Sequence, residues 1–177
     1  MTAAIKHNFY LPIRTEDMLR EFIRVSFGVV VPDQKVCDDH TTPWQAFCDA
    51  YFARSPVSVW KASRGFGGKS FLLALLGLVE AVTLGADVNV LGASGEQSGR
   101  VLTHMQSFWN YKNAPRTLLT STVTRETRMT NGARVAALMA SQASVRGPHP
   151  QRLRMDEIDE MRIDILDAAL GQPMSNN

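Results

Sequence analysis

A short apolar run near the middle of the chain is followed by a glycine-rich turn, a lysine and a serine. In order, these residues are Val57 to Trp60, Gly65, Gly67, Gly68, Lys69 and Ser70. Glycines allow backbone N–H groups to close around phosphate oxygens, and the positive end of the following helix attracts the anion. In this layout Lys69 would reach the β- and γ-phosphates of a nucleotide, and the Ser70 hydroxyl would ligate Mg²⁺. The spacing therefore predicts a phosphate-binding P-loop with ATP and Mg²⁺ as its cofactors.

The predicted loop departs from the strict P-loop pattern at one position. The pattern places a glycine five residues before Gly68, where this chain has Ser63. Ser63 is small and the nearby glycines supply backbone freedom, so we interpret the loop as a variant P-loop. The alternative interpretation is an ordinary glycine-rich turn between a strand and a helix. The residues expected to hold the nucleotide are Ser63, Arg64, Gly65, Phe66, Gly67, Gly68, Lys69 and Ser70.

Two adjacent acidic residues near the end of the chain favour the phosphate-binding interpretation. Residues 149–161 predict a strand that ends in Asp156 and Glu157. A P-loop ATPase needs one carboxylate at a strand end to hold Mg²⁺, and often a second carboxylate to polarise the attacking water. An Asp-Glu pair alone is common at helix starts, but a pair that follows a P-loop by roughly 90 residues is a much stronger indication. We therefore predict that Asp156 binds Mg²⁺ and that Glu157 acts on the water.

The composition is that of one globular domain in water. The chain has 177 residues, of which 45% are hydrophobic and 20% charged, with a net charge of +2. No apolar run approaches the about eighteen residues of a membrane span, and the N-terminus lacks a signal-peptide core, so we expect a cytoplasmic protein. The near-neutral charge does not indicate a nucleic-acid-binding surface. Cys37, His40 and Cys48 lack the fourth ligand and the spacing of a zinc site.

Local signals predict the elements that precede the loop. Residues 1–14 are expected to form an extended arm, followed by a helix from Thr15 to about Phe27 that a glycine ends. A Thr-Pro pair at 42–43 starts a second helix, whose aromatic face we expect in the core. The expected boundaries are residues 1–40 for the arm and first helix and 41–177 for the core, and the aromatic face comprises Trp44, Phe47, Tyr51 and Phe52.

The second half of the chain alternates between strand and helix patterns. Residues 87–91 predict a buried strand, and a helix is expected from there to about Trp109. Residues 118–130 are rich in β-branched side chains, and Asn131-Gly132 predicts a hairpin to the next strand. The acidic strand and a short helix over about 163–170 complete the chain. This order predicts an α/β fold with a mostly parallel sheet flanked by helices, an antiparallel hairpin, and ligands at the carboxyl ends of the strands.

Four segments, taken in order, resemble one known family. They are HTTPWQAFCDAYF, KASRGFGGKSFLLALL, NVLGASGEQSGRV and NGARVAALMASQASVRGPHPQRLRMDEIDEM, and they span His40 to Met161. In this order they resemble the ATPase domain of phage terminase large subunits, the motors that pump DNA into a procapsid. The distinguishing features are an arginine inside a P-loop that lacks its first glycine, the NGA hairpin, and an arginine-glycine pair before the acidic strand. The resemblance implies a P-loop NTPase fold of the ASCE type.

The resemblance also implies roles for individual residues. Lys69 and Ser70 are similar to the Walker A lysine and hydroxyl residue. Asp156 resembles the Walker B magnesium ligand and Glu157 the catalytic glutamate. Gln45 matches a glutamine that reads the adenine edge.

Two arginines have counterparts in the family as well. Arg64 lies where terminases carry an arginine that senses the γ-phosphate, although the extra glycine leaves its register uncertain by one residue. Arg146 resembles an arginine that reaches into the site of a neighbouring subunit. Both residues are therefore predicted to be catalytic, with a plain surface charge as the alternative.

The family implies partners that this chain would meet as part of a larger motor. These are double-stranded DNA, further copies in a homo-oligomeric ring, the terminase small subunit and the portal protein, all in the host cytoplasm. The chain stops after the Walker B region, without the coupling strand or nuclease domain of the family, so we expect an amino-terminal fragment. Two alternatives stay open: a helicase-like P-loop ATPase, and a non-catalytic module for nucleotide binding or assembly.

Overall fold

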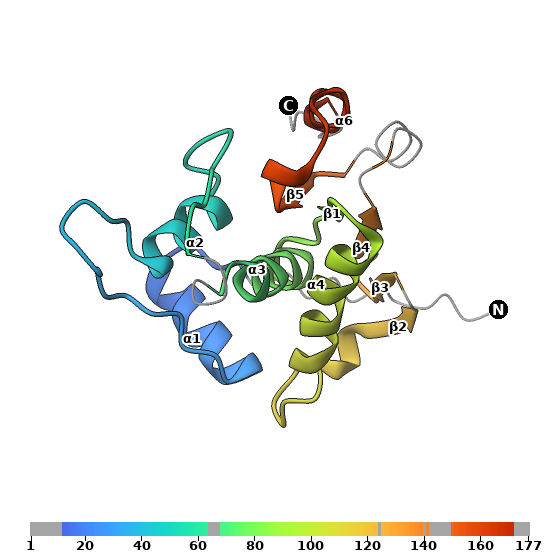
Figure 1. Cartoon of the computed structure of the whole chain (residues 1–177). Helices are drawn as coiled ribbons and strands as arrows, with labels where there is room; N and C mark the ends of the chain where they lie inside the picture. Colours follow the sequence, from blue (N-terminus) through green and yellow to red (C-terminus); the bar gives the residue numbers. More distant parts are fainter. Residues whose placement is uncertain (1–11, 64–67, 124, 140, 142–149, 172–177) are drawn as a thin grey trace.

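One five-stranded sheet, with most helices on one of its faces, organises the molecule (Figure 1). The computed structural model describes residues 12–63, 68–123, 125–139, 141 and 150–171. Two short 3₁₀ helices, Arg116–Leu118 and Ile158–Glu160, accompany the main elements. The main elements are α1 (Glu16–Phe27), α2 (Pro43–Tyr51), α3 (Lys69–Leu84), β1 (Val88–Gly92), α4 (Gly95–Phe108), β2 (Leu119–Val123), β3 (Glu126–Met129), β4 (Arg134–Met139), β5 (Arg152–Asp156) and α6 (Ile163–Leu170).

The strand order in the sheet is β2-β3-β4-β1-β5. Strands β4, β1 and β5 are parallel, whereas β2, β3 and β4 are joined by antiparallel pairing. The α/β class and the hairpin at Asn131-Gly132 are confirmed, and Gly132 has the positive φ of 92° that such a turn requires. The sheet is only partly parallel, however, and not mostly so.

Residues 118–130, whose β-branched side chains favour extended structure, form two strands in the structure. The chain reverses between Val123 and Glu126, which pair with each other across an additional hairpin. Residues 118–130 contain neither glycine nor proline, so the sequence carries no turn signal at this reversal. β-branched residues favour extended structure on both sides of it, which makes two short strands look like one long strand.

The apolar run Val57 to Trp60, which leads into the predicted loop, is not a strand in the structure. Val57 and Val59 are 64% and 72% exposed, which no buried strand would allow. A strand needs a partner strand for its backbone hydrogen bonds. Strand β5 lies at the edge of the described sheet and, within the described residues, pairs with β1 alone. Apolar content alone therefore does not make this run a strand.

Helices α1 and α2 begin where the sequence places them. The Thr15 hydroxyl accepts a hydrogen bond from the backbone N–H of Met18, and α1 ends at Gly28 with φ of 66°. Helix α2 has Thr42 as its N-cap and Pro43 at its first position. The aromatic face of α2 is largely in the core, where Trp44, Phe47 and Tyr51 are buried.

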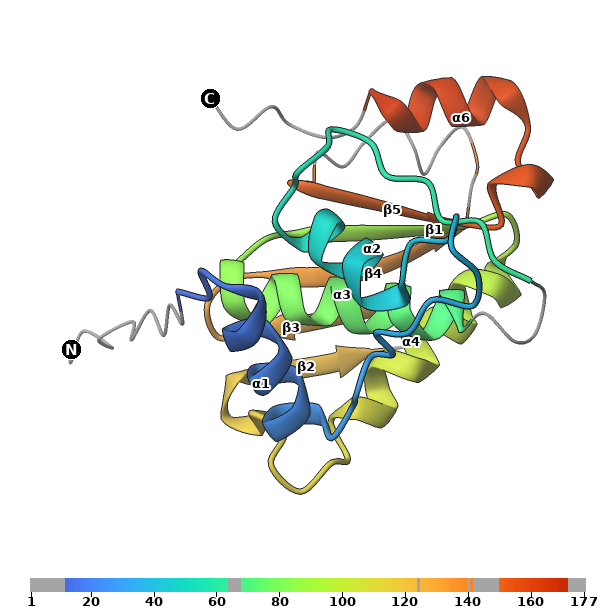
Figure 2. The same cartoon turned by 90° about the vertical axis from the view of Figure 1, so that its left-hand side faces the viewer.

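Helix α3 is the centre of the core. It lies between the sheet on one side and helices α1 and α2 on the other (Figures 1 and 2). A helix covered on both sides is expected to be apolar all round, and residues 72–83 are buried without a break. At Gly77 the backbone comes close to its neighbours: an added Cβ would lie 3.2 Å from Met105 Cε of α4 and 3.4 Å from Val88 Cγ1 of β1.

Helix α6 covers part of the opposite face of the sheet. Leu91 and Ala169 are buried there, with Leu153, Met155 and Ile165 packed against them. No helix in the described part of the chain combines the length and the apolar character needed to cross a membrane.

Candidate functional site

The N-terminus of α3 presents the two residues predicted to contact phosphate and metal. Gly68 is the N-cap and has φ of 56°, a conformation that favours glycine, and no atom of the described residues lies within 4 Å of an added Cβ. Lys69 begins the helix, and its Nζ donates to the carbonyl oxygen of Ala62 at 2.9 Å. This bond closes the base of the predicted loop by joining its two ends.

The Ser70 hydroxyl meets the carboxylate of Asp156. Ser70 Oγ donates to Asp156 Oδ2 at 2.5 Å, a length typical of a hydrogen bond from a hydroxyl to a carboxylate. The two residues are 86 positions apart in the sequence. Asp156 is the last residue of β5 and is only 6% exposed. The structure therefore brings together the two residues that the sequence singled out as metal ligands.

The backbone at Glu157 is in the left-handed region, with φ of 54° and ψ of 50°. Residues other than glycine adopt this conformation rarely, and it costs of order 1–3 kcal/mol when the surrounding structure enforces it. Strand β5 ends one residue earlier, at Asp156. The Glu157 carboxylate accepts a hydrogen bond from the Gln97 side chain.

Gln97 is a residue of the site that the sequence analysis did not identify. Its Nε2 donates to Glu157 and also to Glu160, the latter at 2.9 Å. Its Oε1 accepts from the backbone N–H of Ser94 at 2.7 Å, as part of the capping box that starts α4. The spacing Ser94-x-x-Gln97 is the local signal of that capping box, but nothing local could reveal the bond to Glu157, 60 residues away.

Close packing of α4 on β1 places Gln97 beside Glu157. Gly92, the last residue of β1, pairs with Asp156 in the sheet. A Cβ at Gly92 would lie 2.5 Å from the backbone nitrogen of Ser98, so a larger residue would push α4 away. The carboxyl ends of two parallel strands and the N-termini of two helices thus meet at one edge of the sheet, where α/β proteins bind ligands.

Gln45, predicted to read adenine, lies on α2 with its side chain exposed. Its Oε1 accepts from the backbone N–H of Thr42 at 3.1 Å, completing the capping box of α2. That bond engages the acceptor half of the amide in the fold, and the adenine role stays a prediction. Ser63 is exposed and belongs to no helix or strand. Other predicted site residues lie outside the described residues: Arg64, Gly65, Phe66, Gly67 and Arg146.

A cavity of about 1060 Å³ opens beside Lys69. Its volume is close to the upper end of the roughly 300–1,000 Å³ of small-molecule sites. Trp60 and Phe71 offer aromatic surface to it, and Lys61 and Lys69 offer positive charge, which suits a ligand with a ring and an anionic group. Gln45 is not among the described residues that line the cavity. The lining comes from parts of two segments, residues 29–43 and 54–63, together with Ala46, Asp49, Gly68, Lys69, Phe71 and Leu72.

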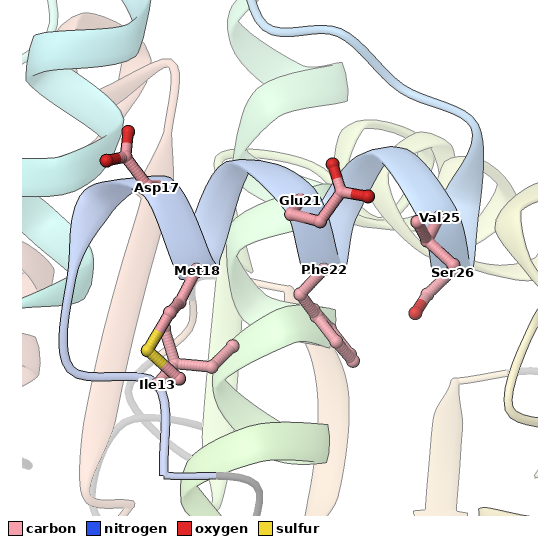
Figure 3. A pocket seen from close by; sticks show the side chains of 7 residues that line it. All are labelled: Ile13, Asp17, Met18, Glu21, Phe22, Val25 and Ser26. Carbon is pink, nitrogen blue, oxygen red and sulfur yellow. The ribbon is translucent and has the colours of Figure 1, made fainter.

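A second, shallower hollow lies on the outer face of α1 (Figure 3). Its volume is about 530 Å³, and it contains none of the predicted site residues. Ile13, Met18 and Phe22 form its apolar side, while the carboxylates of Asp17 and Glu21 point away from them. We assign it no role in nucleotide chemistry.

The cysteines occupy different environments. Cys37 is exposed, and its Sγ lies 3.0 Å from Nδ1 of His40. Cys48 is in the core, and burial raises the pKa of its thiol to about 12. Among the described residues, no three His, Cys, Asp or Glu side chains are grouped as for a metal ion. Mg²⁺ in nucleotide sites needs only one or two protein oxygens besides water and phosphate, so this finding concerns zinc-like sites only.

The chain matches no family model, and no curated protein matches it.

Proposed function

We propose that the chain is the ATP-binding and ATP-hydrolysing domain of a viral DNA-packaging terminase large subunit. The observation that supports this most is the hydrogen bond from Ser70 Oγ to Asp156 Oδ2. It links the two predicted motifs across 86 residues, at the carboxyl end of a parallel strand and the N-terminus of a helix. The alternative interpretation, an ordinary glycine-rich turn, does not predict a contact between this serine and a buried carboxylate.

The side chains present fit a magnesium nucleotide. Hydroxyl and carboxylate oxygens are the ligands that Mg²⁺ prefers, and Ser70 and Asp156 provide one of each. Mg²⁺, when bound, supplies positive charge to the phosphates. Lys69 would exchange its bond to the Ala62 carbonyl for the β- and γ-phosphates, and α3 would direct its N-terminal N–H groups at them. Glu157 would orient the attacking water.

The wider role of the motor belongs to the same proposal. We place ATP hydrolysis in the service of DNA translocation into a procapsid, by a ring of identical subunits in the host cytoplasm with a small subunit and a portal protein as partners. Arg64 would sense the γ-phosphate of its own subunit, and Arg146 would act on that of its neighbour. The resemblance of the four sequence segments supports these roles.

A second candidate is a module that binds nucleotide without hydrolysing it. The observation that favours it is the bond between Gln97 and Glu157, which occupies the carboxylate that would act on the water. Phosphate release measured on the purified chain separates the two candidates.

Fluorescent ATP-analogue titration tests the proposal. Lys69→Ala should abolish binding, because the lysine contacts phosphates in the ground state, whereas Lys112→Ala, an exposed lysine elsewhere, should bind as the wild type does. Glu157→Gln should keep binding and lose phosphate release, and Asp156→Asn should lose the Mg²⁺ dependence of binding. Equal binding by the wild type and Lys69→Ala would overturn the P-loop assignment.

A further inference from the structure

A fully buried carboxylate interrupts the apolar surface of α3. Glu80 is the only acidic residue of this helix and is 0% exposed. It faces β5, where Arg152 and Arg154 occupy alternate positions and therefore point to the same side of the sheet.

Both arginines contact one oxygen of Glu80. Arg154 Nη2 donates to Glu80 Oε1, and Arg152 Nε lies 3.3 Å from the same atom. Glu80 Oε2 is buried and has no hydrogen-bond partner among the described residues. Burial raises the pKa of the Glu80 carboxyl, and the guanidinium groups of Arg154 and then Arg152 oppose that shift. The charges of this cluster are therefore paired but incompletely hydrogen-bonded.

Stability alone does not account for such a cluster. Desolvation of buried charges costs several kcal/mol per ion, and replacing a buried ion pair by apolar side chains of similar size is often neutral or stabilising. A charged cluster does differ from an apolar contact in being directional. Apolar contacts are non-directional, whereas a shift of α3 along β5 would separate buried Glu80 from the guanidinium groups and leave its charge unpaired.

The cluster joins the same two elements that carry Ser70 and Asp156. Ser70 and Glu80 are ten positions apart, about 15 Å along α3. On β5, Arg154 and Arg152 are two and four positions before Asp156, about 7 and 13 Å along the strand. Helix α3 and strand β5 are therefore joined at two places, by Ser70 with Asp156 and by Glu80 with the two arginines.

We propose that Glu80, Arg152 and Arg154 form a register clasp that holds α3 against β5 so that the Ser70 hydroxyl meets the Asp156 carboxylate. Glu80 is then a positioning residue for the predicted metal site, about 15 Å from it along the helix. The inference about metal binding rests on the proposed function, whereas the coupling between the two contacts does not.

The first test compares an apolar clasp with a matched control. The double variant Glu80→Leu with Arg154→Leu removes the directional contact and leaves Arg152 free to reach solvent. The control, Tyr51→Phe with Thr83→Val, removes the buried 2.8 Å contact between the Tyr51 and Thr83 hydroxyls, which ties α3 to α2 instead. Glu80→Gln serves as a conservative variant that keeps an oxygen acceptor for Arg154. Thermal unfolding identifies the variants that fold.

Binding of a fluorescent ATP analogue is then titrated with Mg²⁺ and repeated in EDTA. The apolar double variant should bind the analogue in EDTA as the wild type does, but its half-saturating Mg²⁺ concentration should rise about tenfold, the lower end of the effect of outer partners of a metal site. The control should have the half-saturating Mg²⁺ concentration of the wild type. Glu80→Gln should have a value much closer to that of the wild type than to that of the apolar double variant. A folded double variant with the wild-type Mg²⁺ requirement would overturn the inference.

A second test needs no nucleotide and distinguishes failure of the clasp from failure of the proposed function. Ser70→Ala is introduced into the wild type, the apolar double variant and the control. If the clasp holds Ser70 against Asp156, Ser70→Ala should lower the Tm less in the double variant than in the other two backgrounds. Equal lowering in all three would refute the clasp. Absence of nucleotide binding by the wild type would refute the proposed function alone.

Discussion

The N-terminal layer, formed by α1, α2 and the loop between them, differs from the predicted nucleotide site in the range of the contacts that cap its second helix and close its loop. In the N-terminal layer, Thr42 bonds to Gln45 three residues away and to Asp33 nine residues away, and Arg20 pairs with Asp33 thirteen residues away. At the site, the separations are 86 residues for Ser70 and Asp156 and 60 for Gln97 and Glu157.

We expect the loss of a contact to have a different consequence in each of the two regions. Short-range contacts decide where a helix begins and how a loop closes, so their loss should appear in stability. Long-range contacts at the carboxyl ends of the strands position groups for chemistry, so their loss should appear in activity while the fold persists. Mutations in the two regions can test this division, because each region offers side chains whose partners are known.

The largest effect is expected from Gln97→Leu at the site. Glu157 loses the donor that fixes its carboxylate, so phosphate release should fall about tenfold, as is typical when an outer partner of a reactive group is removed. Affinity for the ATP analogue should stay unchanged. Steady-state phosphate release and analogue titration measure the two quantities separately.

Gln106→Leu is the matched control, because it makes the same chemical change on the same helix. A rise in phosphate release by Gln97→Leu would show that the bond from Gln97 keeps the Glu157 carboxylate away from the attacking water instead of orienting it. An equal fall in Gln106→Leu would assign the effect to α4 as a whole and would break the division between the two regions.

The sequence predicted the N-terminal layer because its signals are local. Thr15 and Gly28 mark the ends of α1, and Thr42 with Pro43 marks the start of α2, through side chains that act within one helical turn. The apolar run at residues 57–60 forms no strand for the complementary reason, since a strand depends on a partner that the run itself does not specify.

At the site, the sequence predicted residues but not their partners. Lys69, Ser70 and Asp156 were identified because their chemistry requires those residue types at those spacings, and the structure brings Ser70 and Asp156 together. Gln97 and Glu80 were missed because a glutamine in a capping box and a glutamate in a helix are ordinary residues until the sheet brings β5 beside them.

An intermediate effect is expected from Thr42→Ala in the N-terminal layer. The Thr42 hydroxyl accepts from the backbone N–H of Gln45 at 3.0 Å and donates to Asp33 at 2.8 Å, so the variant loses the N-cap of α2. The free energy of unfolding should fall by about 1 kcal/mol, the usual cost of losing a threonine cap. Urea unfolding measures it, with Thr41→Ala, an exposed neighbour, as the control. An unchanged free energy of unfolding in Thr42→Ala would contradict the assignment of this contact to stability.

The smallest effect concerns the pH dependence of the same contact. The Thr42 hydroxyl and, next, the Arg20 guanidinium hold the pKa of Asp33 below its ordinary value of 3.8. A carboxyl whose pKa is lowered by folding contributes stability above the pKa of the unfolded chain and loses that contribution as pH falls through the lower value of the folded protein. The difference in unfolding free energy between the wild type and Asp33→Asn should therefore be constant above about pH 5 and should shrink below pH 3.8. Urea unfolding at a series of pH values measures this difference, with Asp38→Asn as an exposed control. A difference that stays constant down to pH 2 would show that the charge of Asp33 contributes nothing to stability. The contact between Asp33 and Thr42 would then act as a neutral hydrogen bond.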